Sequence, residues 1–269
     1  MTLLKDAITI AQAAGKLIEE KKNKLVITEK AKDDLVTNAD KESQELIIKM
    51  IKKLYPTHGI LAEESENNDT LEIFTNSKYI WIIDPIDGTT NYSKGLQFYA
   101  VSIGIFETKA AETSKNFEYL SGELIAGVVH APALGETYYA EKGKGAYLNG
   151  KKINVSKVKK LSEGLTVTGF PPNFKKENLP NFEKMLFASR AIRRLGAASL
   201  DMCYVAKGVF EAYWEVGLHP WDIAAGALII EEAGGKVTDT FGNTLDLFGQ
   251  DVLATNSHIH TQTTSCLAP

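Results

Sequence analysis

The sequence lacks the features of a secreted or membrane-bound protein. Its 269 residues include only two cysteines, Cys203 and Cys266, which cannot build a disulfide framework and are typical of a reducing compartment. The apolar run from Ile223 to Ile230 falls well short of the ~20 residues that a membrane-spanning helix requires. Charge appears as early as Lys5, too soon for a signal peptide. We therefore expect a soluble, cytoplasmic protein with no membrane partner.

The sequence also lacks an excess of basic residues. Thirty Lys and Arg residues stand against 34 Asp and Glu residues, which gives a formal net charge of −4. A nucleic-acid-binding protein would show a concentrated basic stripe, so a nucleic-acid partner is not expected. A mild acidic excess does not exclude a small anionic substrate held by metal ions.

The spacing of apolar residues predicts alternating helices and strands. One helix is expected over 7–22, and a second begins at the capping residue Thr37 and stops at Tyr55-Pro56. The β-rich run Tyr79 to Ile83 predicts a buried strand that Asp84-Pro85 terminates. Later strands are expected at 100–106, 124–130, 137–140, 165–169 and 209–216, and later helices at 179–189, 198–206 and 221–233.

This order predicts an α+β fold or a layered α/β fold in two parts. The N-terminal part, 1–145, would carry most of the candidate site, and the C-terminal part, 146–269, would complete one integrated catalytic unit. Just past this boundary, Asn149-Gly150 supplies the two positive-φ residues of a type I′ hairpin turn. Segment 107–123 is longer than a plain hairpin needs and suggests no function, and the tail from Thr261 is expected to fray.

Two aspartates at the end of the strand expected over 79–83 carry the clearest chemical signal. Asp84 stands where the strand ends, and Asp87 can return to the same point across a Pro-constrained turn. Two carboxylates on one short turn suit Mg²⁺, which prefers oxygen ligands. Gly88-Thr89-Thr90 then offers backbone N–H groups and hydroxyls that could hold a phosphate group.

Other interpretations of this segment are available. Asp and Thr side chains in such a turn often cap only their own backbone. Calcium binding would need an Asp-x-Asp-x-Asp-Gly loop with a closing Glu, which the segment does not have. The haloacid dehalogenase scheme needs a nucleophilic aspartate two residues before Asp87, where this chain has Pro85.

Further acids stand at the starts or ends of other expected elements. Glu63 and Glu64 follow a short apolar run, and by themselves they would be ordinary solvated charges. Asp222 and Asp40 occur in the first turns of helices, where the helix dipole favours an acid in any case. Taken together, however, these acids could supply the bridging and flanking carboxylates that a pair of divalent ions needs.

Two long motifs then identify a family. The first is Asp84-Pro85-Ile86-Asp87-Gly88-Thr89-Thr90-Asn91, and the second is Trp221-Asp222-Ile223-Ala224-Ala225-Gly226. Segments around Asp40, Glu63 and Gly234 match in the same order and spacing. The chain, from about residue 5 to residue 260, resembles the inositol monophosphatase family of metal-dependent, lithium-sensitive phosphatases. The resemblance implies a layered α-β-α-β-α sugar-phosphatase fold, commonly a homodimer.

By position, the resemblance implies two to three Mg²⁺ ions at one site. The implied metal ligands are Glu63, Asp84, the Ile86 carbonyl, Asp87 and Asp222, with Asp84 shared between two ions. Glu63 would also help to hold a third, weaker ion, and Glu64 would support it. The Thr89 hydroxyl, oriented by Asp40, would position or deprotonate the attacking water.

The resemblance also implies which residues contact the substrate. The amides of Gly88 and Thr89 would hold the phosphate, and Glu215 would bond a hydroxyl of the alcohol. The other implied substrate residues are Asp87, Thr90, Arg193, Ala198 and Asp222.

The implied activity is Mg²⁺-dependent hydrolysis of a small phosphate monoester without a phospho-enzyme. Myo-inositol 1-phosphate is the expected substrate. Thr90-Asn91 disfavours 3′-phosphoadenosine 5′-phosphate, because phosphatases of that ester usually carry Lys-Glu there. Fructose 1,6-bisphosphate, histidinol phosphate and 3′-phosphoadenosine 5′-phosphate remain alternative substrates. An alternative of another class is a regulatory role in binding protein or RNA, with the metal site retained.

Overall fold

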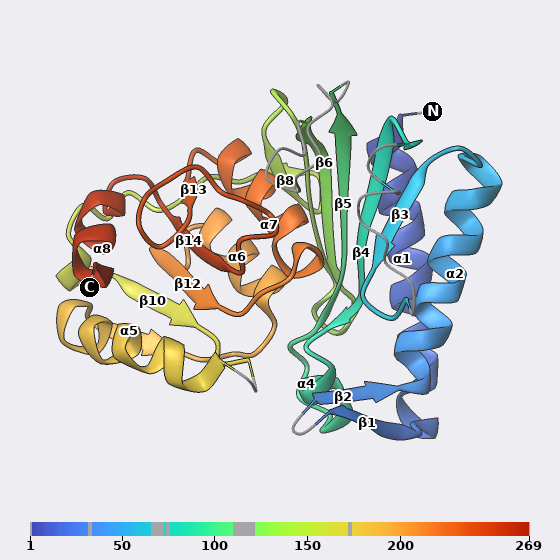
Figure 1. The fold of residues 1–269 in the computed structure, drawn as a ribbon, viewed down its shortest axis with the longest axis horizontal. Coiled ribbons are helices and arrows are strands. Elements are labelled where there is room, and N and C mark those ends of the chain that lie inside the picture. Colours follow the sequence, from blue (N-terminus) through green and yellow to red (C-terminus); the bar gives the residue numbers. More distant parts are fainter. Residues whose placement is uncertain are drawn as a thin grey trace.

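Five alternating layers of helices and sheets make up the structure (Figure 1). The computed structural model describes residues 2–31, 34–65, 73, 76–109, 122–171 and 174–268. Most of segment 107–123 lies outside these residues. In the part of the chain described, no helix has both the length and the apolar character needed to cross a membrane.

A seven-stranded sheet and two helices form the N-terminal layers. The helices are α1 (Leu3–Lys21) and α2 (Asn38–Leu54), and a short hairpin precedes α2, β1 (Ile27–Ala31) with β2 (Asp34–Thr37). The sheet order is β3 (Gly59–Ala62), β4 (Tyr79–Asp87), β5 (Ala100–Thr108), β6 (Gly122–Ala131), β7 (Glu136–Glu141), β8 (Ala146–Leu148) and β9 (Lys151–Lys152). The apolar stripe of α1, which recurs every three or four residues, is fully buried against this sheet.

A five-stranded sheet and four helices form the remaining layers. The strand order of this second sheet is β11 (Ala191–Arg193), β10 (Leu165–Thr168), β12 (Ala212–Val216), β14 (Asp251–Thr255) and β13 (Lys236–Thr238). Helices α6 (Ala198–Ala206) and α7 (Pro220–Glu232) pack between the two sheets, and α5 (Lys175–Ala188) and α8 (His260–Leu267) cover the outer face of the second sheet (Figure 1). The expected layered fold is therefore confirmed.

Some details differ from the expectations. The first sheet continues through Lys152, so the boundary expected between 145 and 146 falls within it. The tail does not fray: it forms α8, because Thr263 and Leu267 are buried against the second sheet. Strand β4 does not stop at Asp84 but runs on to Asp87. The predicted hairpin turn is present, with φ of 48° at Asn149 and 82° at Gly150.

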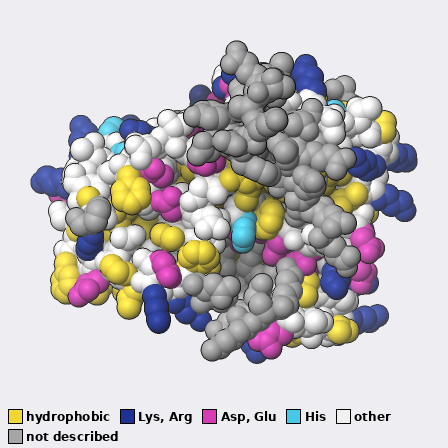
Figure 2. Space-filling view, in the orientation of Figure 1, with side chains coloured by type: hydrophobic (Ala, Val, Ile, Leu, Met, Phe, Trp, Pro, Cys, Tyr) yellow, Lys and Arg dark blue, Asp and Glu magenta, His cyan; other side chains and the backbone are white. Residues whose placement is uncertain are grey.

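Charged side chains of both signs are mixed on the face shown in Figure 2. Lys and Arg side chains lie mostly toward the outer edges, with Asp and Glu side chains between and beside them. Among the side chains coloured on this face, charges of one sign do not form a continuous stripe.

Helix α7 is apolar on all sides because a sheet lies on each side of it. Two glycines of the first sheet allow its close approach. A Cβ on Gly104 would lie 2.8 Å from Cβ of Ala224, and a Cβ on Gly127 would lie 2.8 Å from the carbonyl oxygen of Ala225. The position of α7, and of every residue on it, thus depends on bare backbone at two sites of the sheet.

We predict that Gly127→Ala destabilises the protein and displaces α7. The added methyl group meets backbone rather than a flexible side chain, and such overpacking costs about 1–3 kcal/mol. Thermal melting should show a Tm lower by several degrees. Gly249→Ala, in an exposed loop where the nearest atom to the added Cβ is 3.2 Å away instead of 2.8 Å, is the control and should change the Tm less. An equal Tm for wild type and Gly127→Ala would contradict this account of the packing.

Candidate active site

The register of the first sheet places Glu63 beside Asp84. Strands β3 and β4 run parallel, and their last registered pair is Ala62 with Ile83. The N–H of Glu63 continues this pairing by donating to the carbonyl of Ile83 at 3.2 Å. The next residues of the two strands, Glu63 and Asp84, therefore emerge together at the carboxyl ends of parallel strands, a usual position for ligand-binding groups.

A bulge in β4 places Asp84 and Asp87 on one face of the sheet. Asp84 pairs with Ser102 and Asp87 with Ala100, so β4 has one residue more than β5 over this interval. Without the extra residue, an odd separation would send the two carboxylates to opposite faces. Asp84 shares its face with Ile80 and Ile82, which pack against α7. Both aspartates thus face the layer of α6 and α7.

Asp222 reaches the same region from the first turn of α7. Its carboxylate accepts the backbone N–H of His219 at 2.7 Å, and the His219 side chain accepts a hydrogen bond in return, which forms a capping box. The His219 ring also stacks on Trp221, with centroids 4.9 Å apart. Pro220 in the first turn and this reciprocal cap fix where Asp222 stands.

The acids act on one another through their charges. Burial raises the pKa of Asp84 well above its ordinary value, and the charges of Glu63, Asp87, Asp222 and Asp40 raise it further. Burial raises the pKa of Asp222 as well, although the His219 backbone donor opposes this. The charges that raise the pKa of Asp84 thus all belong to carboxylates. Carboxylate oxygens are the ligands that a hard divalent cation prefers.

Local hydrogen bonds orient two of these carboxylates. The Asp84 carboxylate accepts the N–H of Ile86 at 2.9 Å, and the Asp222 carboxylate accepts that of His219 at 2.7 Å. Within the described residues, no group of three or more His, Cys, Asp and Glu side chains has the geometry to hold a metal ion.

The phosphate-binding segment predicted at Gly88-Thr89-Thr90 is a sharp turn into a short helix, α4 (Thr89–Ser93). Gly88 has a φ of 88°, and a Cβ there would lie 3.1 Å from both Cβ of Ala197 and the carbonyl oxygen of Phe98. Only glycine satisfies both requirements. The left-handed residue followed by helical residues directs successive N–H groups to one side, a geometry that suits an anion.

The Thr89 hydroxyl lies between two acceptors. Its oxygen is 3.0 Å from Oδ1 of Asp40 and 3.0 Å from the carbonyl oxygen of Ile86. The other oxygen of Asp40 accepts the N–H and the hydroxyl of Thr37, as the predicted capping box requires. Asp40 is fully buried. It therefore both caps α2 and orients Thr89.

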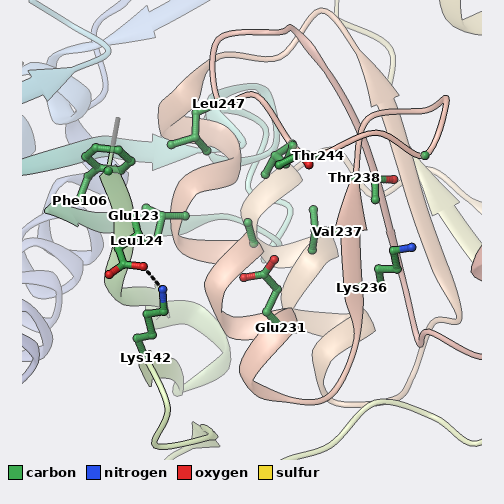
Figure 3. A pocket seen from close by; sticks show the side chains of 14 residues that line it. Phe106, Glu123, Leu124, Lys142, Glu231, Lys236, Val237, Thr238, Thr244 and Leu247 are labelled. Carbon is green, nitrogen blue, oxygen red and sulfur yellow. Dashed lines mark hydrogen bonds and ion pairs between the residues drawn. The ribbon is translucent and has the colours of Figure 1, made fainter. Parts of the chain in front are cut away.

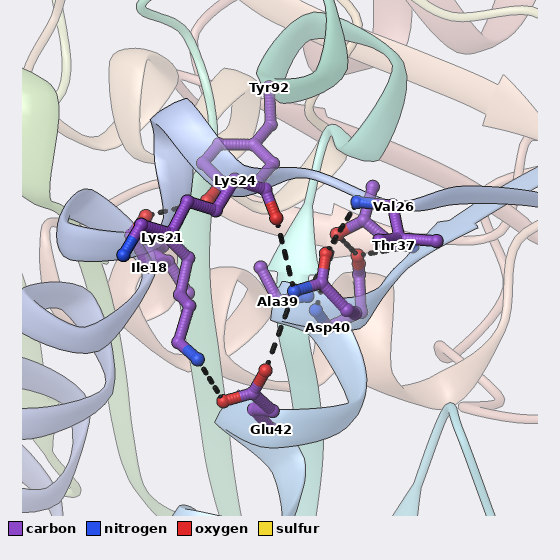
Figure 4. A network of polar contacts seen from close by, with 10 residues as sticks. Ile18, Lys21, Lys24, Val26, Thr37, Ala39, Asp40, Glu42 and Tyr92 are labelled. Atoms are coloured by element: carbon purple, nitrogen blue, oxygen red, sulfur yellow. Dashed lines mark hydrogen bonds and ion pairs between the residues drawn. The ribbon is translucent and has the colours of Figure 1, made fainter.

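A polar network holds this end of α2 in place (Figure 4). The side chain of Asn38 accepts the N–H of Val26 at 2.8 Å and donates to Glu42, which pairs with Lys21 at the end of α1. In α4, the Tyr92 hydroxyl donates to the carbonyl of Ile18 at 2.5 Å. The segments that carry Asp40 and Thr89 are thus both anchored to α1.

Asp87 connects the acid cluster to the second half of the chain. Its carboxylate accepts the N–H groups of Ala198 and Ser199 at 3.0 and 2.7 Å and the Ser199 hydroxyl at 2.5 Å. These N–H groups begin α6, which has no capping side chain of its own. Burial raises the pKa of Asp87, and the donors of Ser199 oppose this. The expected substrate residue Ala198 therefore lies beside the cluster.

The remaining predicted residues lie at different distances from the cluster. Glu215 is buried at the end of β12, and its carboxylate accepts the Tyr213 hydroxyl at 2.7 Å. Glu64 is partly buried, and its N–H donates to the side chain of Gln44. Thr90 is exposed on α4. Arg193 is exposed on the edge strand β11, where its guanidinium donates to the carbonyl of Ile192.

The sequence analysis missed three residues of this region. Ser199 bonds Asp87, and Asp201 and Arg194 both act on the pKa of Glu215 or are acted on by it. Ser199 and Asp201 have the ordinary appearance of polar residues in a first helical turn, and Arg194 gives no signal apart from its neighbour Arg193. Only the folded arrangement distinguishes them.

A cavity of about 490 Å³ lies elsewhere, at the other end of α7 from Asp222 (Figure 3). Leu124, Val237 and Leu247 line it, together with Glu231 and the pair of Lys142 and Glu123. Burial raises the pKa of Glu231, and Lys142 opposes this. None of the predicted site residues lines this cavity.

The chain is similar to proteins of known family. A sequence model of the inositol monophosphatase family matches residues 2–268. The chain is 38% identical to human inositol monophosphatase 1, over 94% of this chain and 89% of that protein. It is 39% identical to the Nus factor SuhB of Pseudomonas aeruginosa, over 90% and 86%. It is 40% identical to the fructose-1,6-bisphosphatase/inositol-1-monophosphatase of Thermotoga maritima, over 84% and 80%.

Solved structures agree with this result. The extragenic suppressor protein SuhB of Bartonella henselae superposes with a TM-score of 0.86 at 32% identity, over 98% of each chain. A Staphylococcus aureus relative solved with bound inositol monophosphate superposes with a TM-score of 0.77 at 28% identity, over 98% of this chain and 93% of that chain. The sequence match spans nearly the whole chain and the fold agrees with it, so this protein belongs to the inositol monophosphatase family.

Proposed function

We propose that this protein is a Mg²⁺-dependent phosphatase that hydrolyses a small polyol phosphate, with myo-inositol 1-phosphate as its substrate. The observation that supports this most directly is the convergence of Glu63, Asp84, Asp87 and Asp222 beside the turn at Gly88. Acids from two strands and a helix meet next to a group of N–H donors, which is the arrangement that a phosphate ester and its counter-ions need.

The acid cluster suits two to three Mg²⁺ ions. Glu63, Asp84 and the Ile86 carbonyl would hold one ion, and Asp84, Asp87 and Asp222 a second, with Glu64 supporting Glu63. When bound, the ions would lower the pKa of a water and neutralise the charge that develops on the phosphate and on the leaving oxygen. Four other acids act on Asp84: Glu63, Asp87, Asp222 and Asp40. Its carboxylate is therefore the one that we propose both ions share.

The chain's own groups complete the chemistry. Asp40 holds the Thr89 hydroxyl at 3.0 Å, and this hydroxyl would orient the attacking water toward phosphorus. The N–H groups of Gly88 and Thr89 would bind the phosphate oxygens. Cys203 is fully buried in α6, and burial raises the pKa of its thiol, so it is not placed as a nucleophile. In the proposed mechanism water attacks phosphorus directly, without a phospho-enzyme.

Recognition of the alcohol falls mainly to the second half of the chain. Glu215 would accept a hydroxyl hydrogen bond, with Ala198 and Arg193 as further candidates from the resemblance, and Thr90 would contribute from the first half. Fructose 1,6-bisphosphate is an alternative substrate for this protein, because the relative from Thermotoga maritima is named for activity on that ester as well as on inositol 1-phosphate. Histidinol phosphate and 3′-phosphoadenosine 5′-phosphate complete the panel to be tested. We also propose a homodimer in the cytoplasm.

The purified protein should release phosphate from myo-inositol 1-phosphate with Mg²⁺, and EDTA should stop the reaction.

Asp84→Asn should lower kcat by roughly 10²–10³-fold or more, because it removes charge stabilisation at the reacting centre. Phosphate release measures activity, and circular dichroism checks that the variant folds. Near-normal turnover by Asp84→Asn would refute the assignment. Inactivity of the wild type on the whole panel would instead favour a regulatory role like that named for the relative SuhB.

Thr89→Ala should lower kcat far more than it changes the Mg²⁺ concentration for half-maximal rate. The side chain orients water and does not itself carry charge. Thr89→Ser keeps the hydroxyl and is the matched control, which should retain most of the activity. Rates measured over a Mg²⁺ titration separate the two quantities. A large shift of the titration midpoint with unchanged kcat would show that Thr89 serves the metal instead.

The metal-free protein should lose stability as the pH rises above about 4. The pKa values of Asp84, Asp87 and Asp222 are raised in the folded state, so the native state holds more protons than the unfolded state in this range. The unfolding free energy then falls with pH. Measurement of the Tm in EDTA from pH 5 to pH 8 tests this prediction. Added Mg²⁺ should raise the Tm more at pH 8 than at pH 5.

Asp84→Asn supplies the control for this measurement. The variant carries no charge at the centre of the cluster, so its Tm in EDTA should exceed that of the wild type increasingly as the pH rises. If the Tm of the two proteins changed with pH in the same way, repulsion within the cluster would not govern stability.

A further inference from the structure

Three hydrogen bonds from the start of α6 hold the carboxylate of Asp87. The N–H of Ala198 donates to Oδ1 at 3.0 Å, and the N–H and the hydroxyl of Ser199 donate to Oδ2 at 2.7 and 2.5 Å. Both Asp87 and Ser199 are buried, with 7% and 0% of their surfaces exposed. Ser199 therefore supplies both of the donors at Oδ2, although no step of the proposed reaction uses its hydroxyl.

The two N–H bonds are a property of the helix and do not depend on its side chains. The first N–H groups of an α-helix have no partner within the helix, and α6 has no capping side chain of its own. Asp87, from strand β4, therefore caps α6 from outside. The hydroxyl bond is different, because it exists only where residue 199 carries a hydroxyl group.

The Ser199 hydroxyl points out of its own helix. A serine in or next to a helix can donate back to the carbonyl of the preceding turn, as Ser189 at the end of α5 does to Met185 at 2.8 Å. Among the residues that the structure describes, the Ser199 hydroxyl donates only to Asp87. Its bond thus joins two segments that are 112 residues apart in the chain.

Asp87 needs such support because its neighbours are acids. Its charge raises the pKa of Asp84 and of Asp222, so these carboxylates repel one another when they are ionised. Burial raises the pKa of Asp87 itself, and the hydroxyl and the N–H of Ser199 oppose this more than any other donor. Hydrogen bonds to an ionised group are strong ones. The donors of Ser199 therefore hold in place a carboxylate that neighbouring charges would otherwise displace.

We propose that Ser199 is a positioning residue of the metal site: its hydroxyl fixes Oδ2 of Asp87, and this keeps the carboxylate oriented for binding a divalent cation. The proposal rests on the proposed function, in which Asp87 is a metal ligand. It deepens that function by naming a residue outside the ligands that sets the affinity for the metal. Loss of a partner that donates to a ligating carboxylate typically lowers metal affinity or activity by roughly 10–100-fold.

Ser199→Ala should weaken Mg²⁺ binding about tenfold. The loss is expected at the lower end of that range, because the N–H donors of residues 198 and 199 remain. Isothermal titration calorimetry of the purified full-length chain with MgCl₂ measures the Kd without any turnover. An unchanged or lower Kd in Ser199→Ala would overturn the proposal.

Ser189→Ala is the matched control. Ser189 is also a buried serine whose hydroxyl makes a hydrogen bond, but it lies at the end of α5, on the outer face of the second sheet. Each variant loses one buried hydroxyl group, so each should lower the Tm in EDTA modestly. Only Ser199→Ala should show weaker Mg²⁺ binding and a smaller rise of the Tm when Mg²⁺ is added. Equal losses of Mg²⁺ affinity in the two variants would refute a specific role for Ser199.

Ser199→Thr keeps the hydroxyl group and tests whether the hydrogen bond, and not the size of the side chain, sets the affinity. A folded Ser199→Thr, as judged by circular dichroism, should bind Mg²⁺ with a Kd close to that of the wild type. Binding as weak as that of Ser199→Ala would contradict the proposal. If the added methyl group prevents folding, the comparison of Ser199→Ala with Ser189→Ala decides.

The rate of phosphate release should show the same effect. With myo-inositol 1-phosphate, Ser199→Ala should need about tenfold more Mg²⁺ for its half-maximal rate, and most of the rate should return at high Mg²⁺. Thr89→Ala should show the opposite pattern, a lower kcat with little change of the midpoint. A low rate in Ser199→Ala that excess Mg²⁺ does not restore would contradict a role in metal affinity.

The outcomes separate this proposal from the proposed function. Weaker Mg²⁺ binding by Ser199→Ala, in a protein whose wild type hydrolyses no ester of the panel, would support the role of Ser199 and refute the phosphatase assignment. Equal Mg²⁺ affinity in Ser199→Ala and in an active wild type would refute the role of Ser199 alone. A wild type that binds no Mg²⁺ would overturn both.

Discussion

Repulsion between carboxylates gathered in a buried space is the constraint on which this site depends. Asp84 is surrounded by the charges of Glu63, Asp87, Asp222 and Asp40, and burial adds to their effect. Such a cluster costs folding energy unless protons or cations neutralise it. The fold positions it with local features: a parallel strand pair, a bulge, a capping box, and a backbone donor to one oxygen of Asp84 and to one oxygen of Asp222. In the proposed function, divalent cations would supply that neutralisation.

The same contacts join the two sheets into one unit. Asp87 belongs to β4 but caps the first turn of α6, and Asp222 belongs to α7, which lies against the glycines of the first sheet. A shift of either helix would therefore change the spacing of the acids. The loop that precedes α6 is bound to the segment after Gly88, because the Asn91 side chain donates to the carbonyls of Leu195 and Gly196. The acids and the first turns of α6 and α7 thus belong to one connected framework.

Much of the fold could be predicted because its signals are local. The capping box at Thr37 and the hairpin at Asn149-Gly150 need only neighbouring residues, and both are confirmed. The continuation of β4 past Pro85 was missed, because it depends on pairing with β5. Helix α8 was missed for a similar reason: its weakly apolar sequence becomes helical where Thr263 and Leu267 are buried.

The sequence by itself determined which acids and which glycine-threonine turn are present, and hence the family and the class of chemistry, because those residue types stand in long motifs with fixed spacing. Only the tertiary structure decided which of them act on one another. Asp40 and Thr89 are far apart in the chain, but the Thr89 hydroxyl oxygen lies 3.0 Å from Oδ1 of Asp40. Electrostatic effects depend on distance and burial, and neither is set until strands and helices have packed.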